Sequence, residues 1–120
     1  MTEENKKVYD LEERTYNFAK NVRSFIKKLS RTITNIEDSA QLTRSSGSVG
    51  ANYIEANEAL SKKDFVMRLK ISRKESKESR FWLRLVEVNN DKLLEKTRSE
   101  LIQESIELMN IFGSIIIKSE

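Results

Sequence analysis

The sequence predicts an all-α protein, an antiparallel up-down-up-down four-helix bundle that occupies residues 1–120 as a single domain. Three observations support this fold class. The 120 residues include no proline and only three glycines, the apolar residues recur at spacings of three and four, and turn signals divide the chain into four segments of helical length. A chain of this size is long enough to bury one hydrophobic core.

The first helix is expected to cover residues 9–29. Its inward-facing stripe is spaced alternately by four and three, and consists of Leu11, Thr15, Phe18, Val22, Phe25 and Leu29. Such a stripe is typical of a helix packed in a bundle. The β-branched segment 31–37 shows no helical period, so we interpret it as the first connection. Within it, Ile33 and Ile36 are expected to cover the end of the bundle.

The second helix is expected to begin near Glu37 or Asp38, because acidic side chains favour a helix N-terminus, and to end near Ala59. Its inward face is expected to be made of small residues, namely Ser45, Ser46, Gly47, Ser48, Gly50 and Ala51, with Ser46, Gly47 and Gly50 as the helix-packing positions. A glycine inside a helix costs about 1 kcal/mol relative to alanine. Close packing against another helix is the expected compensation.

The third helix is expected to follow a cap at Ser61, since Ser61-Lys-Lys-Asp64 resembles a capping box. Its inward face again carries small residues, including Ser72 and Ser76. If the second and third helices are antiparallel around a short turn, facing residues have numbers that sum to about 122. The facing pairs are then Ser72 with Gly50, Ser76 with Ser46, and Arg44 with Glu78.

The fourth helix is expected to cover residues 95–117, after a turn marked by Asn89, Asn90 and Asp91. It carries two neighbouring apolar stripes. One consists of Leu101, Ser105, Leu108, Phe112 and Ile115, and the other of Ile102, Ile106, Met109 and Ile116. Two stripes are more than one bundle core needs, so we expect part of this helix to face a partner subunit.

The composition excludes most familiar chemistry. The sequence has no cysteine and no histidine, which removes disulfides, thiolate nucleophiles, the usual zinc ligand sets and Ser-His or Cys-His pairs. We therefore expect a non-enzymatic protein without cofactor or metal. The first residues lack the apolar core of a signal peptide, and the longest uncharged apolar run, 108–117, is too short to span a bilayer. A cytoplasmic location without membrane contact is expected.

The charge is unevenly distributed. Residues 61–86 carry nine lysines and arginines against three acidic residues, whereas residues 87–120 carry four against seven. Three interpretations remain open: a solvated basic face, charge complementarity between subunits, and contacts to the phosphates of RNA or DNA. The candidate nucleic-acid contacts are Lys70, Arg73, Lys74, Lys77, Arg80 and Arg84.

A set of polar residues could line a site in the bundle core: Arg44, Asn52, Glu75 and Glu78. Paired carboxylates can perform acid–base chemistry, but each of these has a nearby cation and none shows metal-ligand spacing. We therefore interpret the set as a charge pair that fixes helix register. Similarly, Gly47-Ser-Val-Gly50 matches the GxxG of KH domains, yet it lacks the flanking strands and is better explained by helix packing. Trp82 is expected at a boundary where its N–H reaches a partner.

Several segments together resemble a family of bacterial four-helix bundle proteins first known from intervening sequences of large-subunit ribosomal RNA genes. The similarity covers nearly the whole chain. The segments are Asp10-Leu-Glu-Glu-Arg-Thr15, Gln41-Leu-Thr-Arg-Ser-Ser-Gly-Ser-Val-Gly-Ala-Asn52, Glu55-Ala56, Ser61-Lys-Lys-Asp-Phe65 and Lys74-Glu-Ser-Lys-Glu-Ser-Arg-Phe-Trp-Leu83. The residues that carry the resemblance are Gln41, Arg44, Ser45, Ser48, Asn52, Glu55, Lys63, Asp64, Glu75, Glu78 and Trp82.

The resemblance implies an up-down-up-down bundle that assembles into a ring, a homopentamer with a central pore in known members. It also implies kinship with the accessory proteins of diversity-generating retroelements, which are basic pentameric bundles that bind a reverse transcriptase and nucleic acid. The present chain departs from them in its acidic fourth helix. The function favoured by the sequence is a ring-forming structural or adaptor protein whose main partner is itself. The alternative is a nucleic-acid-binding accessory protein that uses the basic third helix, and a partner protein is a further option.

Overall fold

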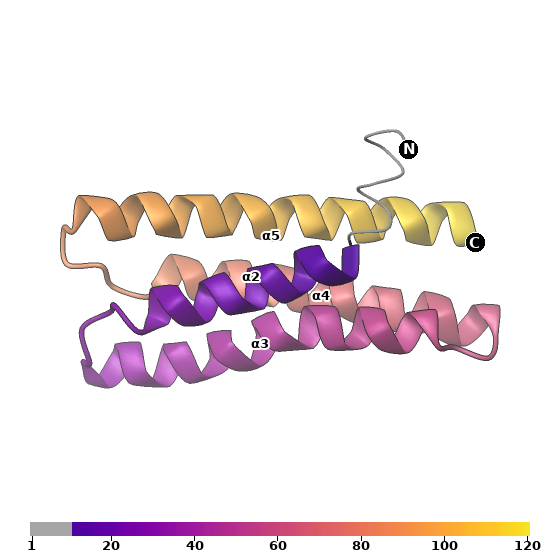
Figure 1. Cartoon of the computed structure of the whole chain (residues 1–120), viewed down its shortest axis with the longest axis horizontal. Helices are drawn as coiled ribbons and strands as arrows, with labels where there is room; N and C mark the ends of the chain where they lie inside the picture. The colour runs from indigo at the N-terminus through magenta and orange to yellow at the C-terminus, as the bar shows by residue number, and fades with distance from the viewer. Residues whose placement is uncertain (1–10) are drawn as a thin grey trace.

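The computed structural model describes residues 11–120. In that part of the chain it contains four helices joined by short connections: α2 (Leu11–Ile26), α3 (Ile33–Asn57), α4 (Lys62–Leu85) and α5 (Lys92–Ser119). Consecutive helices run in opposite directions, and α2 is shorter than the other three (Figure 1). The predicted all-α four-helix bundle is therefore confirmed. The expected start of the first helix at residue 9 lies outside the described residues.

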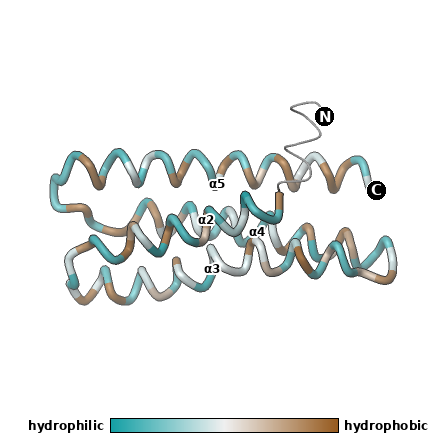
Figure 2. Tube along the Cα trace, viewed as in Figure 1, coloured by the Kyte–Doolittle hydropathy of each residue, from teal (hydrophilic) through white to brown (hydrophobic). Residues whose placement is uncertain are grey.

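The core is formed by one apolar stripe from each helix (Figure 2). The helices α2 and α5 contribute large side chains, whereas α3 and α4 contribute serines at the middle of their contact. The fully buried large side chains include Phe18, Phe25, Leu42, Val49, Leu69, Leu83, Leu108 and Phe112. On α5 the buried residues are Leu101, Ser105, Leu108 and Phe112 of the first predicted stripe, followed by Ile116 of the second. No helix between residues 11 and 120 is both long and apolar enough to cross a lipid bilayer.

The start of α3 differs from the sequence prediction. The helix begins at Ile33, one turn before Glu37 and Asp38, because the Thr32 hydroxyl caps it by accepting a hydrogen bond from the Asn35 backbone N–H at 3.2 Å. A threonine one residue before the helix can satisfy an otherwise unpaired N–H. The helix turns Ile33 and Ile36 outward, with 83% and 46% of their surface exposed. The prediction that they cover the bundle end is therefore wrong.

Asn35 joins the two connections at one end of the bundle. Its Nδ2 donates to the Ser30 carbonyl at 3.0 Å and to the Glu87 carbonyl at 3.1 Å. Its Oδ1 accepts from the Glu87 N–H at 2.9 Å. Because this side chain is almost completely buried, these bonds fix the α2–α3 connection to the α4–α5 connection.

The other predicted turn signals are found in place. The Ser61 hydroxyl accepts a hydrogen bond from the Asp64 N–H at 3.1 Å, and α4 starts at Lys62, directly after Ser61. Asn89 and Asn90 both have positive φ angles, which asparagine tolerates better than most residues. Asp91 then accepts from two backbone N–H groups of the first turn of α5. As a result α5 begins at Lys92, three residues before the expected Glu95.

Candidate functional site

The contact between α3 and α4 is made by buried serines. Ser45, Ser46, Ser72, Ser76 and Ser79 are completely buried. The Ser72 hydroxyl donates to the Val49 carbonyl at 2.9 Å, and the hydroxyls of Ser45 and Ser79 lie 2.9 Å apart. These contacts follow the predicted antiparallel register. A side chain bonded directly to the opposite backbone shows how closely the two helices approach.

The two glycines of α3 face α2 rather than α4. A Cβ atom at Gly50 would lie 2.8 Å from Oγ1 of Thr15, and one at Gly47 would lie 3.1 Å from the Arg23 guanidinium. The sequence register had placed Gly50 opposite Ser72. In the structure, the glycines of α3 allow α2 to pack closely, whereas the serines of α3 allow α4 to pack closely.

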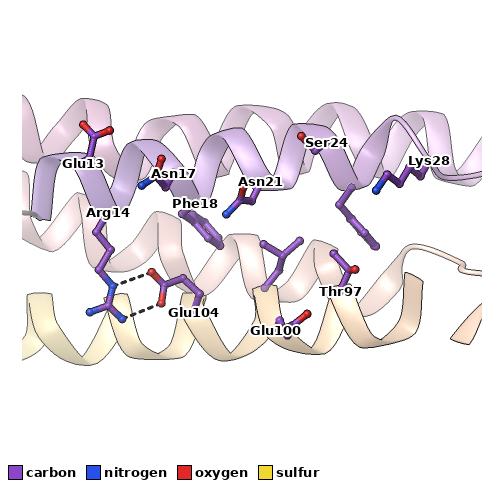
Figure 3. Close-up of a pocket in the computed structure, with 12 residues that line it drawn as sticks. Glu13, Arg14, Asn17, Phe18, Asn21, Ser24, Lys28, Thr97, Glu100 and Glu104 are labelled. Carbon is purple, nitrogen blue, oxygen red and sulfur yellow. Dashed lines mark hydrogen bonds and ion pairs between the residues drawn. The ribbon is translucent and has the colours of Figure 1, made fainter. Parts of the chain in front are cut away.

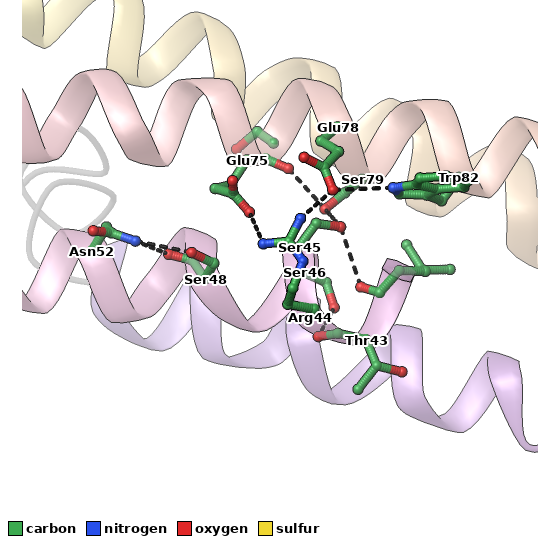
Figure 4. Close-up of polar contacts among 12 residues, drawn as sticks. Thr43, Arg44, Ser45, Ser46, Ser48, Asn52, Glu75, Glu78, Ser79 and Trp82 are labelled. Carbon is green, nitrogen blue, oxygen red and sulfur yellow. Dashed lines mark hydrogen bonds and ion pairs between the residues drawn. The ribbon is translucent and has the colours of Figure 1, made fainter. Parts of the chain in front are cut away.

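A polar cluster lies on the outer side of the α3–α4 contact (Figure 4). Arg44 donates to the buried carboxylate of Glu75 at 3.1 Å and also pairs with Glu78. The half-buried Trp82 donates its Nε1–H to Glu78 at 3.1 Å. The hydrogen bond to Glu78 raises the pKa of Arg44. Both carboxylates are therefore bound to a cation that stays charged.

Asn52 belongs to a separate cluster. Its Nδ2 donates to the carbonyl and to the hydroxyl of Ser48, each at 2.9 Å, and its Oδ1 accepts from Arg68 at 3.1 Å. The structure thus brings Arg44, Glu75 and Glu78 together and leaves Asn52 apart. Across residues 11–120 no three carboxylate, histidine or cysteine side chains are arranged to hold a metal ion. In these two clusters, Arg44 with its two carboxylates and Arg68 with Asn52 join α3 to α4, whereas the bonds of Ser48 and Trp82 stay within one helix.

Four of the six candidate nucleic-acid contacts line a groove of about 840 Å³ between α4 and α5: Lys70, Arg73, Lys74 and Lys77. Its apolar lining includes Met109 and Ile117 of α5. An adjoining hollow adds Lys62, Lys63, Val66 and Met67 and shares Lys70. We refer to these ten residues together as the basic groove.

The charges of the basic groove are mostly unpaired. Lys70 lies 3.8 Å from a carboxylate oxygen of Glu120. Within residues 11–120, Arg73, Lys74 and Lys77 form no ion pair. The other two candidates lie elsewhere: Arg84 lines a hollow beside the α4–α5 connection, and Arg80 has a buried Nε without a hydrogen-bond partner.

A second groove, which the sequence interpretation missed, lies between α2 and α5 (Figure 3). It has a volume of about 710 Å³. Its lining combines Phe18, Phe25 and Leu101 with polar residues such as Asn17, Asn21, Ser24 and Glu100. The sequence signal is the polar series Asn17, Asn21 and Ser24, which runs beside the core stripe at spacings of four and three.

Arg14 bridges this groove at one end. Its Nε and one Nη donate to the carboxylate of Glu104 at 2.8 Å each, and the same Nη reaches Glu107 at 2.9 Å. The hydrogen bond to Glu104 is the main cause of the raised pKa of Arg14. Further along, Asn17, Asn21 and Ser24 make no side-chain hydrogen bond within the described residues. The contact between α2 and α5 is therefore open over most of its length.

Comparison with known proteins identifies a family and similar solved structures. The family model described as "23S rRNA-intervening sequence protein" matches residues 7–114. A crystal structure of a protein with unknown function from the S23 ribosomal protein family of Bacteroides thetaiotaomicron is 28% identical, with a TM-score of 0.74. The match covers 88% of this chain and 96% of that chain. No curated protein matches significantly.

Proposed function

The chain belongs to the 23S rRNA-intervening sequence protein family, and from that premise we propose that it is a non-catalytic assembly protein whose copies associate into a closed ring. The polar clusters support the non-catalytic part of the proposal. Glu75 and Glu78, the carboxylates best placed for acid–base chemistry, both bind Arg44. A general base must be free to accept a proton from a substrate.

The observation that carries the proposal is the amount of apolar surface left on the outside of a small bundle. The large apolar side chains that remain substantially exposed are Tyr16, Ile33, Ile36, Ile54, Leu60, Met67, Phe81, Leu85, Leu93 and Ile117. Exposed apolar side chains that share one face of a helix can mark an interaction surface, and Ile33, Ile36 and Ile54 share one face of α3 at helical spacing. Association between copies would remove part of this surface from water and supply the free energy of assembly.

A ring is the assembly that fits best with family membership and with the asymmetry of the surface. A heterologous contact joins two different patches, and it continues from copy to copy until the rotation closes. The basic groove and the acidic residues of other helices are such different patches. Five copies is the number that the family resemblance implies.

Light scattering with absolute mass determination tests this proposal. We expect a single species whose mass is an integral multiple of the 14.0 kDa chain and which persists at micromolar concentration. A mass of one chain at every concentration would contradict the proposal. A mass that rises continuously with concentration would indicate open filaments rather than a ring.

Nucleic-acid binding is the second candidate function, favoured by the unpaired cations of the basic groove. Neutralising phosphates releases counterions, so binding should weaken steeply with salt. A gel-shift series with RNA and DNA tests this, using a variant with Arg73, Lys77 and Arg80 all changed to alanine. If this function holds, the variant loses affinity and the slope of log affinity against log salt falls by about 2. Binding that is unchanged by the three substitutions excludes this use of α4.

A further inference from the structure

The helix α3 is apolar on two opposite sides. Its inner side carries Leu42, Val49 and Ala56, which are buried in the core. On the outside lies a second row at helical spacing, which we call the outer stripe: Ile33, Ile36, Ala40, Gly47, Ala51 and Ile54. A helix that is apolar on both sides is typical of one buried between two neighbours.

Little within the described residues covers the outer stripe. Ile33 and Ile54 are 83% and 50% exposed, and Ala40 and Ala51 are exposed as well. Gly47 is partly covered by Arg23. The small side chains at the middle of the stripe would allow another surface to approach the α3 backbone closely.

The basic groove is a surface of suitable length and lining. Between Lys62 and Lys77 it extends about 22 Å along α4, and the outer stripe from Ile33 to Ile54 extends about 32 Å, at 1.5 Å per residue, so the groove is long enough to hold most of the stripe. The groove also offers apolar side chains from both of its helices, including Met67 and Ile117, which are 46% and 77% exposed. A single helix can lie in a groove of this kind.

The charges of the two surfaces are complementary. Exposed glutamates flank the outer stripe toward both of its ends, at Glu37, Glu55 and Glu58. Six cations line the basic groove. Two cations lie at the middle of the stripe: Arg23, which contacts Gly47, and Arg44, which occupies the position between Ala40 and Gly47 and is already paired with two carboxylates of its own chain. Opposite charges across an interface select partner and orientation.

We propose that the outer stripe of α3 in one copy docks into the basic groove between α4 and α5 of a second copy. This inference rests on the proposed self-assembly and assigns the contact that produces it. Each copy then keeps one free stripe and one free groove, so further copies add until the ring closes.

Symmetric alternatives are opposed by charge. Two basic grooves facing each other would bring two sets of six cations together. Two outer stripes could pair in antiparallel fashion, with Ala40 opposite Ala51 of the partner subunit, but this places Glu37 beside Glu55 of the partner subunit. Like charges across a contact cost energy.

Nucleic acid is a less suitable occupant of the basic groove than a helix. The residues that line the groove include no aromatic side chain, so it lacks the stacking platform with which single-stranded nucleic acids are usually held.

Three variants test the contact. Ala51→Arg places a bulky cation on the outer stripe, and Lys74→Glu with Lys77→Glu reverses two unpaired charges of the groove. The matched control, Lys20→Glu with Lys96→Glu, makes the same charge change on exposed lysines outside both surfaces. We expect the first two variants to raise the half-assembly concentration by a factor of about 30 or more. The control should assemble as the unaltered protein does.

Mixing the variants gives the decisive measurement by light scattering. The stripe variant keeps an intact groove and the groove variant keeps an intact stripe, so together they should form a complex of two chains and nothing larger. Circular dichroism and thermal unfolding establish that each variant is folded. Ala40→Arg, on the same stripe, should reproduce the loss seen with Ala51→Arg.

Each other outcome overturns the inference in a recognisable way. If the groove variant still assembles and the stripe variant does not, the stripes pair with each other. If both variants assemble like the unaltered protein, these surfaces bind another molecule, such as a nucleic acid or a different protein. If the unaltered protein has the mass of one chain, the proposed ring itself is wrong, and the inference falls with it.

Discussion

The α3–α4 contact and the α2–α5 contact of the same bundle are built in opposite ways. Between α3 and α4, buried serines bring the helices so close that Ser72 donates to a carbonyl of the other backbone. Between α2 and α5, a groove remains, and Arg14 ties the helices at one end. The tight α3–α4 pair therefore fixes the arrangement of this bundle, and α2 and α5 pack against that pair.

The largest expected effect comes from filling the tight contact. Ser72→Leu inserts three extra carbon atoms where the side chain is completely buried and removes the bond to Val49. We expect the free energy of unfolding to fall by about 3 kcal/mol, the upper range for overpacking a core. Chemical denaturation followed by circular dichroism measures this change.

The matched control for that substitution is Asn21→Leu in the open groove. Because Asn21 is exposed there, we expect a change within about 0.5 kcal/mol. Similar losses for the two leucine variants would show that the two contacts are equally tight, and the comparison would fail.

Because the contact between α2 and α5 is open, other contacts must hold these two helices in place. Asn35→Ala removes three hydrogen bonds at one end of the bundle, one to the α2–α3 connection and two to the α4–α5 connection. Leaving these partly buried backbone groups unpaired should lower the free energy of unfolding by about 2 kcal/mol. Hydrogen exchange should also become faster at the Glu87 N–H, which loses its acceptor.

Asn21→Ala is the control for that experiment, since the same chemical change removes no hydrogen bond within the described residues. We expect it to be nearly neutral. If Asn35→Ala were also neutral, the contact between α2 and α5 would have to be stronger than its open groove indicates.

Replacing Gly50 and Gly113 by alanine should change the free energy of unfolding in opposite directions. At Gly50 the new methyl group would lie 2.8 Å from Thr15 Oγ1, and the clash should outweigh the gain in helix propensity, with a net loss of about 1 kcal/mol. At Gly113 the nearest atom is 4.0 Å away, so Gly113→Ala should gain about 1 kcal/mol. Thermal unfolding measures both. A stabilising Gly50→Ala would mean that α2 can move away from α3 without cost.

The smallest effect is expected for Arg14→Ala. Its ion pairs with Glu104 and Glu107 are only partly shielded from solvent, so the loss should be below about 1 kcal/mol. It should shrink in 1 M salt, where charges are screened over about 3 Å. A loss as large as that of Ser72→Leu, or one insensitive to salt, would make Arg14 a main support of the bundle.

The sequence predicted what depends on local pattern. The four helices follow from apolar spacing, and the pairing of Arg44 with Glu78 follows because a short turn near Ser61 leaves little freedom of register. The role of the glycines was harder to assign. Gly50 has no side chain to indicate a direction, so spacing alone could not decide whether it faced α2 or α4.

The remaining differences are non-local. The sequence indicated a start for α3 near Glu37 or Asp38, whereas the observed start at Ile33 accompanies the contacts that Asn35 makes with Glu87, 52 residues away. Likewise, the open groove depends on how α2 and α5, which are distant in sequence, pack against the α3–α4 pair. The spacing of residues within one helix contains no information about that distance.

The turn between α3 and α4 differs from the other connections in a way that is useful for engineering. It lies at the end of the bundle opposite the Asn35 bonds (Figure 1), and Leu60 within it is 99% exposed. Exposed turns tolerate inserted segments best. We therefore expect Leu60 to accept a grafted epitope or fluorescent tag, and a ring of copies would display that graft several times on one rim.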